Sequence, residues 1–215
     1  MKYGLIVFDW DGTIIDSAST IAQCIRDAAA DLGLPVPTRE QASHVIGLGL
    51  HDALRGAVPD LPAERISEFV ARYRVHFLKS EDSMGLFGGM RELIESLSRD
   101  RRLAIATGKS RRGLDRALDA TGLKQYFRAS RCADETHPKP HPAMLLELMG
   151  ELDVQTADAV MIGDTSHDLE MARAAGVDAV AVTYGAHTEE HLRACAPLTC
   201  LSSVGHLSAW LRTNG

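Results

Sequence analysis

The sequence predicts an α/β fold with a doubly wound, mostly parallel, Rossmann-like sheet and an α-helical domain inserted after the first strand. Short apolar, β-branched runs alternate with amphipathic helical patterns along most of the chain, as in βαβ units. Most of these runs lack polar–apolar alternation, as expected for strands covered by helices on both faces. The alternation stops between residues 17 and 80, where only helical patterns occur.

The strands and the helices between them follow from hydrophobic periodicity. Strands are predicted at 3–9, 102–107, 126–132, 158–164 and 178–185, with an edge strand near 198–203. The third is the weakest because it mixes polar and apolar residues. Helices are predicted at 89–100, 110–122, 141–152, 166–176 and 204–212.

The inserted segment contains four helical patterns, at 17–33, 39–46, 51–58 and 62–80. A direct crossover between parallel strands needs about a dozen residues, yet the second strand begins only at residue 102. We therefore predict a core domain of residues 1–15 and 85–215 and a helical domain of residues 16–84. The second link, 81–89, contains three glycines and is predicted to act as a hinge.

Composition limits the partners and the compartment. The chain has 215 residues, of which 45% are hydrophobic and 24% charged, and a formal net charge of −6. This argues against disorder and against broad electrostatic binding of nucleic acid. No apolar run is long enough for a membrane span, the first run is too short for a signal peptide, and the four cysteines form no CxxC pair. We expect a reduced, cytoplasmic protein.

Polar residues follow the predicted strands where each one ends. Asp9, Asp11 and Thr13 follow the first strand, and Thr107 and Gly108 follow the second. Further along the chain, three more such residues come after the third and fourth strands, namely Lys139, Asp164 and Asp168. Ligands of open α/β sheets bind at the carboxyl ends of strands, so these side chains are predicted to meet at one edge.

This set of residue types favours a metal together with a phosphate. Clustered carboxylates raise one another's pKa, and a hard cation such as Mg²⁺ removes that conflict. Lys139 and the helix N-terminus after Thr107 supply the positive charge and amide donors that a phosphate dianion needs. A carboxylate can attack phosphorus, and a second acid can protonate the leaving oxygen and then activate water.

Several of these residues also have a purely structural interpretation. Thr107 and Asp164 could cap the helices that follow them, and Asp168 could be an acid favoured in a first helical turn. Lys109 is predicted to be a solvated loop lysine. The Trp10 side chain is predicted to pack in the core or against the helical domain.

Four segments resemble the motifs of the haloacid-dehalogenase-like superfamily of phosphohydrolases. They are "DWDGT" (9–13), "ATGKS" (106–110), "PKP" (138–140) and "GDTSHD" (163–168), and they occur in the family's order. The helical insert resembles the cap of the phosphoglycolate-phosphatase-like branch. The pair formed by the first and fourth motifs is the specific part of this signal, whereas the threonine and the lysine alone would be weak.

The resemblance implies roles for the acids and the lysine. Asp9 would be the nucleophile and a Mg²⁺ ligand. Asp11 would be the general acid and base, and its backbone carbonyl would also bind Mg²⁺. Asp164 would be the third metal ligand, Asp168 would support it through water or Lys139, and Lys139 would neutralise charge on the nucleophile and phosphate.

The resemblance also implies a phosphate and substrate site. Thr107 and the amide of Gly108 would hold the phosphoryl oxygens, and Thr13 would order the loop after the first strand. Trp10 and His51 are further candidates for substrate contact. His51 lies at the entrance of a predicted helix, where the loop at 46–52 could touch the substrate or form an ordinary connection between two helices.

The implied activity is a Mg²⁺-dependent phosphatase acting on a small phosphorylated metabolite, with phosphoglycolate as one candidate. The alternatives are a phosphomutase of the same superfamily and a non-catalytic phosphate-binding module. Dehalogenases of this superfamily usually lack the second acid, and a phosphonate hydrolase would need a cap lysine, for which Lys79 is badly placed. A monomer or a homodimer is expected.

Overall fold

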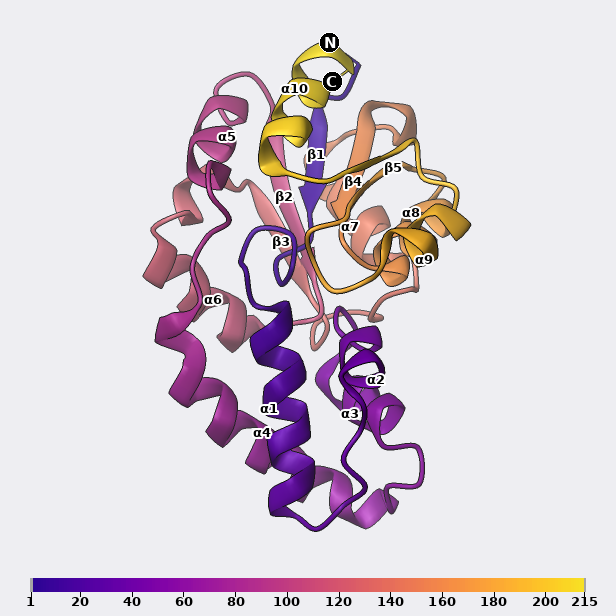
Figure 1. Ribbon diagram of the computed structural model, residues 1–215. Coiled ribbons are helices and arrows are strands. Elements are labelled where there is room, and N and C mark those ends of the chain that lie inside the picture. Colours follow the sequence, from indigo (N-terminus) through magenta and orange to yellow (C-terminus); the bar gives the residue numbers. More distant parts are fainter. Residues whose placement is uncertain (1, 215) are drawn as a thin grey trace.

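Six parallel strands form one sheet in the order β3-β2-β1-β4-β5-β6 in this computed structural model, which describes residues 2–214 (Figure 1). The strands are β1 (Leu5–Phe8), β2 (Arg102–Thr107), β3 (Ala129–Cys132), β4 (Ala159–Gly163), β5 (Asp178–Val182) and β6 (Thr199–Leu201). The predicted fold class is confirmed. β1 pairs in parallel with both β2 and β4, so the strand order changes direction beside β1, where ligands of such sheets bind.

Helices cover both faces of the sheet. One face packs against α5 (Met90–Leu97), α6 (Arg111–Thr121) and α10 (Val204–Asn214), and the other against α7 (Ala143–Leu152) and α8 (Ser166–Ala175). Alternate residues of β1 serve the two layers: Ile6 and Phe8 join the first, and Leu5 and Val7 join the second. Fully covered strands of this kind show no polar face, which explains the unbroken apolar runs.

β3 begins three residues later than predicted, because Lys124–Tyr126 forms a 3-10 turn, and the segment after β4 differs as well. The chain leaves β5 at Val182, three residues earlier than predicted, and forms a loop that contacts the site described below. A short helix, α9 (Glu189–Ala194), follows this loop and packs through Leu192. Leu192 is the one buried residue of α9, so the segment has no apolar periodicity from which a helix could be predicted.

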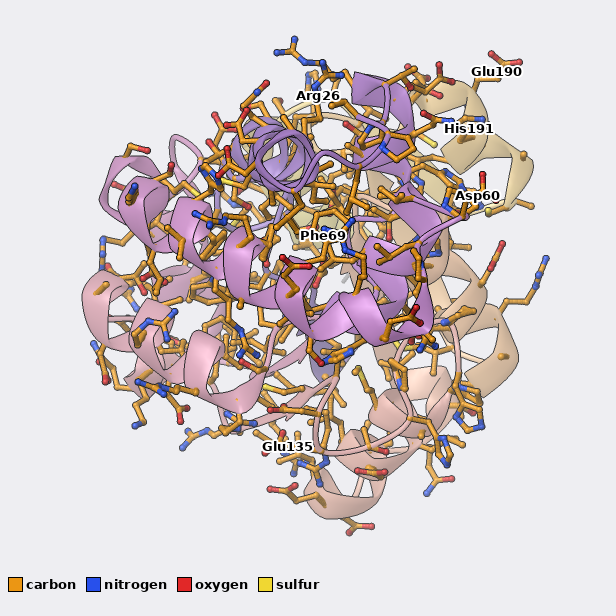
Figure 2. The ribbon with its side chains drawn as sticks, turned by 90° about the horizontal axis from the view of Figure 1, so that it is seen from below. Arg26, Asp60, Phe69, Glu135, Glu190 and His191 are labelled. Atoms are coloured by element: carbon orange, nitrogen blue, oxygen red, sulfur yellow. The ribbon has the colours of Figure 1, made fainter. Side chains whose placement is uncertain are left out.

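The inserted helices have a core of their own. Helices α1 (Ala18–Asp31), α2 (Arg39–His44), α3 (Leu50–Ala57) and α4 (Ile66–Ser80), here called the cap, pack around a shared set of buried apolar side chains. Phe69 is fully buried and points into the middle of this group (Figure 2). The cap lies beyond the carboxyl ends of the strands, while both chain termini lie at the opposite end of the molecule (Figure 1).

The two links between core and cap run side by side. The amide of Asp16 donates to the carbonyl of Gly85 at 2.9 Å, and the amide of Phe87 donates to the carbonyl of Ile14 at 3.1 Å. These contacts and the separate apolar cores support the domain boundaries that we propose, 1–15 with 85–215 and 16–84. Across residues 2–214, no helix is long and apolar enough to cross a membrane.

Candidate active site

Asp164 lies between two glycines at the centre of the sheet edge. Gly12 has a φ of +80°, and a Cβ there would lie 2.2 Å from Asp164 Oδ2. A Cβ on Gly185 would come equally close to the same oxygen. Thr13 Oγ1 and the amide of Ala186 each donate to this carboxylate at 2.7 Å. The tight turn after β1 and the loop after β5 therefore pack closely around the buried carboxylate of Asp164, and a side chain at either glycine would clash with it.

Lys139 joins the first and fourth motifs through two ion pairs. Its Nζ lies 2.7 Å from Asp9 Oδ1 and 2.6 Å from Asp168 Oδ1, and all three side chains are buried. The other oxygen of Asp168 accepts from the amide and hydroxyl of Thr165 at 3.1 and 2.8 Å. Asp168 thus takes part both in the capping box of α8 and in the ion pair with Lys139.

Negative charge accumulates at this buried centre. Carboxylate oxygens of Asp9, Asp164 and Asp168 lie within 4.8 Å of one another. Burial raises the pKa of Asp9 well above its usual value despite Lys139, and burial together with Asp168 raises the pKa of Asp164 to about 7. Burial alone would lower the pKa of Lys139, but the Asp168 and Asp9 carboxylates outweigh it, so the pKa is raised.

These residues fit a divalent cation. Asp9 Oδ2 is buried and has no hydrogen-bond partner among residues 2–214. A buried polar atom without a partner is costly, and hard cations bind carboxylate oxygens. One oxygen of Asp9 is therefore free at the point where three acids converge, which is an arrangement that a divalent cation would stabilise.

Asp11 lies apart from this centre and faces the cap. Its carboxylate accepts a hydrogen bond from Ser17 Oγ at 2.9 Å and pairs with Lys109 Nζ at 3.1 Å. The Lys109 ammonium also lies over the ring of Phe77 on α4, 4.7 Å from its centroid. The prediction that Lys109 is a solvated loop residue is therefore wrong, because only 10% of its side chain is exposed.

The loop after β2 forms the other wall. Thr107 is buried, and its Oγ1 accepts from the amide of Lys109 at 3.2 Å. Thr107 does not cap α6, since the side chain of Ser110 accepts from the amide of Gly113 in that role. A Cβ on Gly108 would lie 2.5 Å from the carbonyls of Gly47 and Leu48. The cap loop thus rests directly on the backbone of Gly108.

Two residues of the predicted substrate site lie elsewhere. The Trp10 side chain is buried in the apolar core, so it is the backbone of Trp10 that remains a candidate for substrate contact. His51 is exposed on α3, and its predicted contact with substrate stays a prediction.

Several residues around the site were missed by the sequence analysis. Ser17 occupies the N-cap position of α1, but its hydroxyl donates to Asp11 and does not cap the helix. His167 and His187 of the core place Nε2 at 2.9 and 3.0 Å from the carbonyl of His44 on α2, and so connect core and cap. No rule of sequence spacing predicts such contacts between distant segments. The place of Lys109 in the motif "ATGKS" could have indicated that it lies at the site.

The chain is similar to known proteins over most of its length. The family model described as "Haloacid dehalogenase-like hydrolase" matches residues 6–182. "Probable phosphatase IndB" of Dickeya dadantii (strain 3937) is 38% identical over 200 residues, which cover 90% of this chain and 86% of that protein. The phosphoglycolate phosphatase of Aliivibrio fischeri (strain ATCC 700601 / ES114) is 31% identical over 191 residues, covering 84% of each chain.

The solved structures show the same fold. The crystal structure of a hydrolase from Pseudomonas syringae has a TM-score of 0.88 to this chain at 20% identity. The match covers 100% of this chain and 99% of that one, so the cap and the core both have counterparts there.

Proposed function

Because the chain belongs to the haloacid dehalogenase-like hydrolases and is a phosphatase of that family, we propose that it hydrolyses a small phosphate monoester through an aspartyl phosphate on Asp9, with Mg²⁺ as cofactor. The name of the Aliivibrio relative makes phosphoglycolate one candidate substrate. We also propose a cytoplasmic location and a monomer or homodimer.

The observation that carries this proposal is the state of Asp9. One of its oxygens pairs with Lys139, and the other is buried with no hydrogen-bond partner in the described part of the chain. A carboxylate in a dry, preorganised site is a competent nucleophile. Lys139 would hold this carboxylate in one orientation and would keep its own charge throughout, because two acids stabilise its ammonium form.

The proposed metal site uses acids that the fold already brings together. Asp9, Asp164 and the backbone carbonyl of Asp11 would hold the ion, and Asp168 would support it through Lys139. Bound Mg²⁺ would neutralise the acids and polarise the phosphoryl group. Thr13 and the amide of Ala186 fix the orientation of Asp164, so this ligand needs no rearrangement.

The proposed reaction divides the work between two acids. Asp9 attacks phosphorus as the bond to the ester oxygen breaks, and Asp11 gives that oxygen a proton. Asp11 then takes a proton from a water molecule that attacks the aspartyl phosphate, which releases inorganic phosphate and restores Asp9. Thr107 and the Gly108 amide would hold the phosphoryl oxygens during both steps.

A phosphate-release assay tests this function. We expect hydrolysis of p-nitrophenyl phosphate with Mg²⁺, loss of activity with EDTA, and recovery when Mg²⁺ is restored. A panel of phosphoglycolate, sugar phosphates, nucleotides and pyrophosphate would then identify the substrate class. A folded sample that binds Mg²⁺ but hydrolyses nothing in the panel would contradict a phosphatase and favour a binding module. A mutase would instead need a sugar bisphosphate and release little phosphate.

Metal binding has a readout that does not depend on turnover. A ligand that binds only the folded state raises its stability. We expect millimolar Mg²⁺ to raise the melting temperature of the wild type, and Asp164→Asn to lose most of that increase. An equal increase in both proteins would place the ion elsewhere.

A further inference from the structure

Lys109 is a second cation in the active site, and the proposed chemistry gives it no task. Lys139 is already engaged with Asp9 and Asp168. Lys109 follows Thr107 and Gly108 by one or two residues, so it is anchored in the same loop that is expected to hold the phosphoryl group. Its Nζ reaches both oxygens of Asp11, at 3.2 and 3.1 Å.

The surroundings of Lys109 are those of an anion-binding group. Phe77 lies against the ammonium, and Tyr73, which is buried, stacks on Phe77 with 5.7 Å between the ring centroids. These cap residues exclude water from one side of the ammonium. A charge-assisted hydrogen bond is stronger in such a site than in water, so an anionic group of a ligand would gain more here than at an exposed lysine.

The present partner of Lys109 is the acid expected to protonate the leaving group. In this structure the Asp11 carboxylate is engaged by both Ser17 and Lys109. An anion on the leaving group could replace Asp11 as the partner of Lys109. Asp11 would then be released to turn toward the leaving oxygen.

We propose that Lys109 binds a second anionic group of the substrate, so that the enzyme prefers phosphate esters or anhydrides whose leaving group carries a carboxylate or a phosphate close to the bridging oxygen. This inference rests on the proposed phosphatase function. Gly108 and Lys109 are adjacent in one loop. The phosphoryl group and the second anion of the substrate must therefore lie close together, which limits the preference to small substrates.

The competing explanation is that Lys109 only holds the cap against the core, through its contacts with Asp11 and Phe77. A contact of that kind would affect all substrates equally, because it would act on the position of the cap and not on the leaving group. A group that binds an anion would matter only for substrates that carry one. Comparison of two substrates of similar size, one with and one without the extra charge, separates the two explanations.

The experiment compares 2-phosphoglycolate with 2-hydroxyethyl phosphate, which replaces the carboxylate by a neutral hydroxymethyl group. We expect wild type to prefer 2-phosphoglycolate in kcat/KM, and Lys109→Met to reduce that preference about 10- to 100-fold, the range for a hydrogen bond to a charged group. Lys109→Arg should keep most of the preference. Lys124→Met, at an exposed lysine on the 3-10 turn Lys124–Tyr126, should keep all of it.

Pyrophosphate forms a second arm that distinguishes a phosphate from a carboxylate as the second anion. If pyrophosphate has the higher kcat/KM and loses more of it in Lys109→Met, the anion that Lys109 binds is a phosphate. If 2-phosphoglycolate has the higher kcat/KM and loses more of it, that anion is a carboxylate. An equal loss of kcat/KM for charged and neutral esters in Lys109→Met would overturn the inference and would mean that Lys109 only holds the cap against the core. A wild type with no preference for an anionic leaving group would overturn it as well.

If the proposed phosphatase function is wrong, the experiment gives a different result. In that case no ester would be turned over, and the inference would be judged from binding alone. Protection against thermal unfolding by 2-phosphoglycolate should then exceed that by 2-hydroxyethyl phosphate in wild type, and the difference should disappear in Lys109→Met. Equal protection by the two esters in wild type would overturn it.

Discussion

Asp9 and Asp11 are two residues apart in the sequence and lie in opposite environments. Asp9 is 1% exposed and is held by Lys139 from within the core. Asp11 is 13% exposed, and its partners are Ser17, at the start of the first cap helix, and Lys109, which touches Phe77 of the cap. The residue proposed to form the covalent bond is thus fixed by the core, while the residue proposed to move protons is shared with the cap.

This difference indicates how one strand end serves two purposes. A nucleophile benefits from a fixed orientation, and the core alone supplies it through Lys139. An acid that must act first on a leaving group and then on water benefits from partners that respond to the substrate. Movement of the cap would alter the surroundings of Asp11 and leave those of Asp9 largely unchanged.

The largest effect on activity is expected from substitution of the two acids, and the result should differ between Asp9 and Asp11. Asp9→Asn should lower kcat by about 10⁴-fold or more and form no aspartyl phosphate, because the nucleophile is gone. Asp11→Asn should also stall turnover, but it should still accumulate phosphoenzyme from a substrate with a good leaving group such as p-nitrophenyl phosphate. Acid-quenched phosphate incorporation and intact mass measure both. Phosphoenzyme in Asp9→Asn would contradict the assignment of the nucleophile.

The next effect concerns stability and compares the two lysines. Lys139→Met leaves three buried acids facing one another without their cation, which should cost about 3–5 kcal/mol in the free energy of unfolding. Lys109→Met should cost only about 1 kcal/mol, because Asp11 keeps Ser17 and is partly exposed. Urea denaturation without metal measures both. Equal losses would show that the two ion pairs do not differ as their burial suggests.

The same pair of variants has a predictable pH dependence. Asp9 and Asp164 have raised pKa values in the folded state, so folding takes up protons between the unfolded value near 4 and the folded value, and stability falls as the pH rises through that interval. Lys139→Met should raise these pKa values further. Its destabilisation relative to wild type should therefore be larger at pH 8 than at pH 5, whereas that of Lys109→Met should change little.

The sequence predicted the centre around Asp9 better than the surroundings of Asp11, for a physical reason. Strand ends converge at one edge of a parallel sheet, so Asp9, Lys139, Asp164 and Asp168 could be grouped from periodicity and chemistry alone. Lys109 meets Phe77 only through the orientation of the cap on the core. That orientation depends on packing between surfaces, which leaves no periodic trace in the sequence.

The cap contact can be weakened without touching either acid. A Cβ on Gly108 would strike the carbonyls of Gly47 and Leu48, so Gly108→Ala should hold the cap loop off the core and lower kcat/KM about 10-fold or more. Gly150→Ala is the matched control, since a Cβ there meets no described atom within 4 Å and should stabilise α7 by about 0.5–1 kcal/mol. Steady-state kinetics and thermal melts test both. Unchanged kinetics in Gly108→Ala would show that closure tolerates the methyl group.

The smallest effect is expected for the hydroxyl that orients Asp11 from the cap side. Ser17→Ala removes one hydrogen bond, at 2.9 Å, to a carboxylate that keeps Lys109. We expect kcat to fall about 3- to 10-fold with little change in KM, because a single hydrogen bond contributes about 0.5–1.5 kcal/mol. The control is Ser19→Ala, at an exposed serine of the same helix. A rise in KM with kcat unchanged would instead mean that Ser17 contacts the substrate and does not orient the acid.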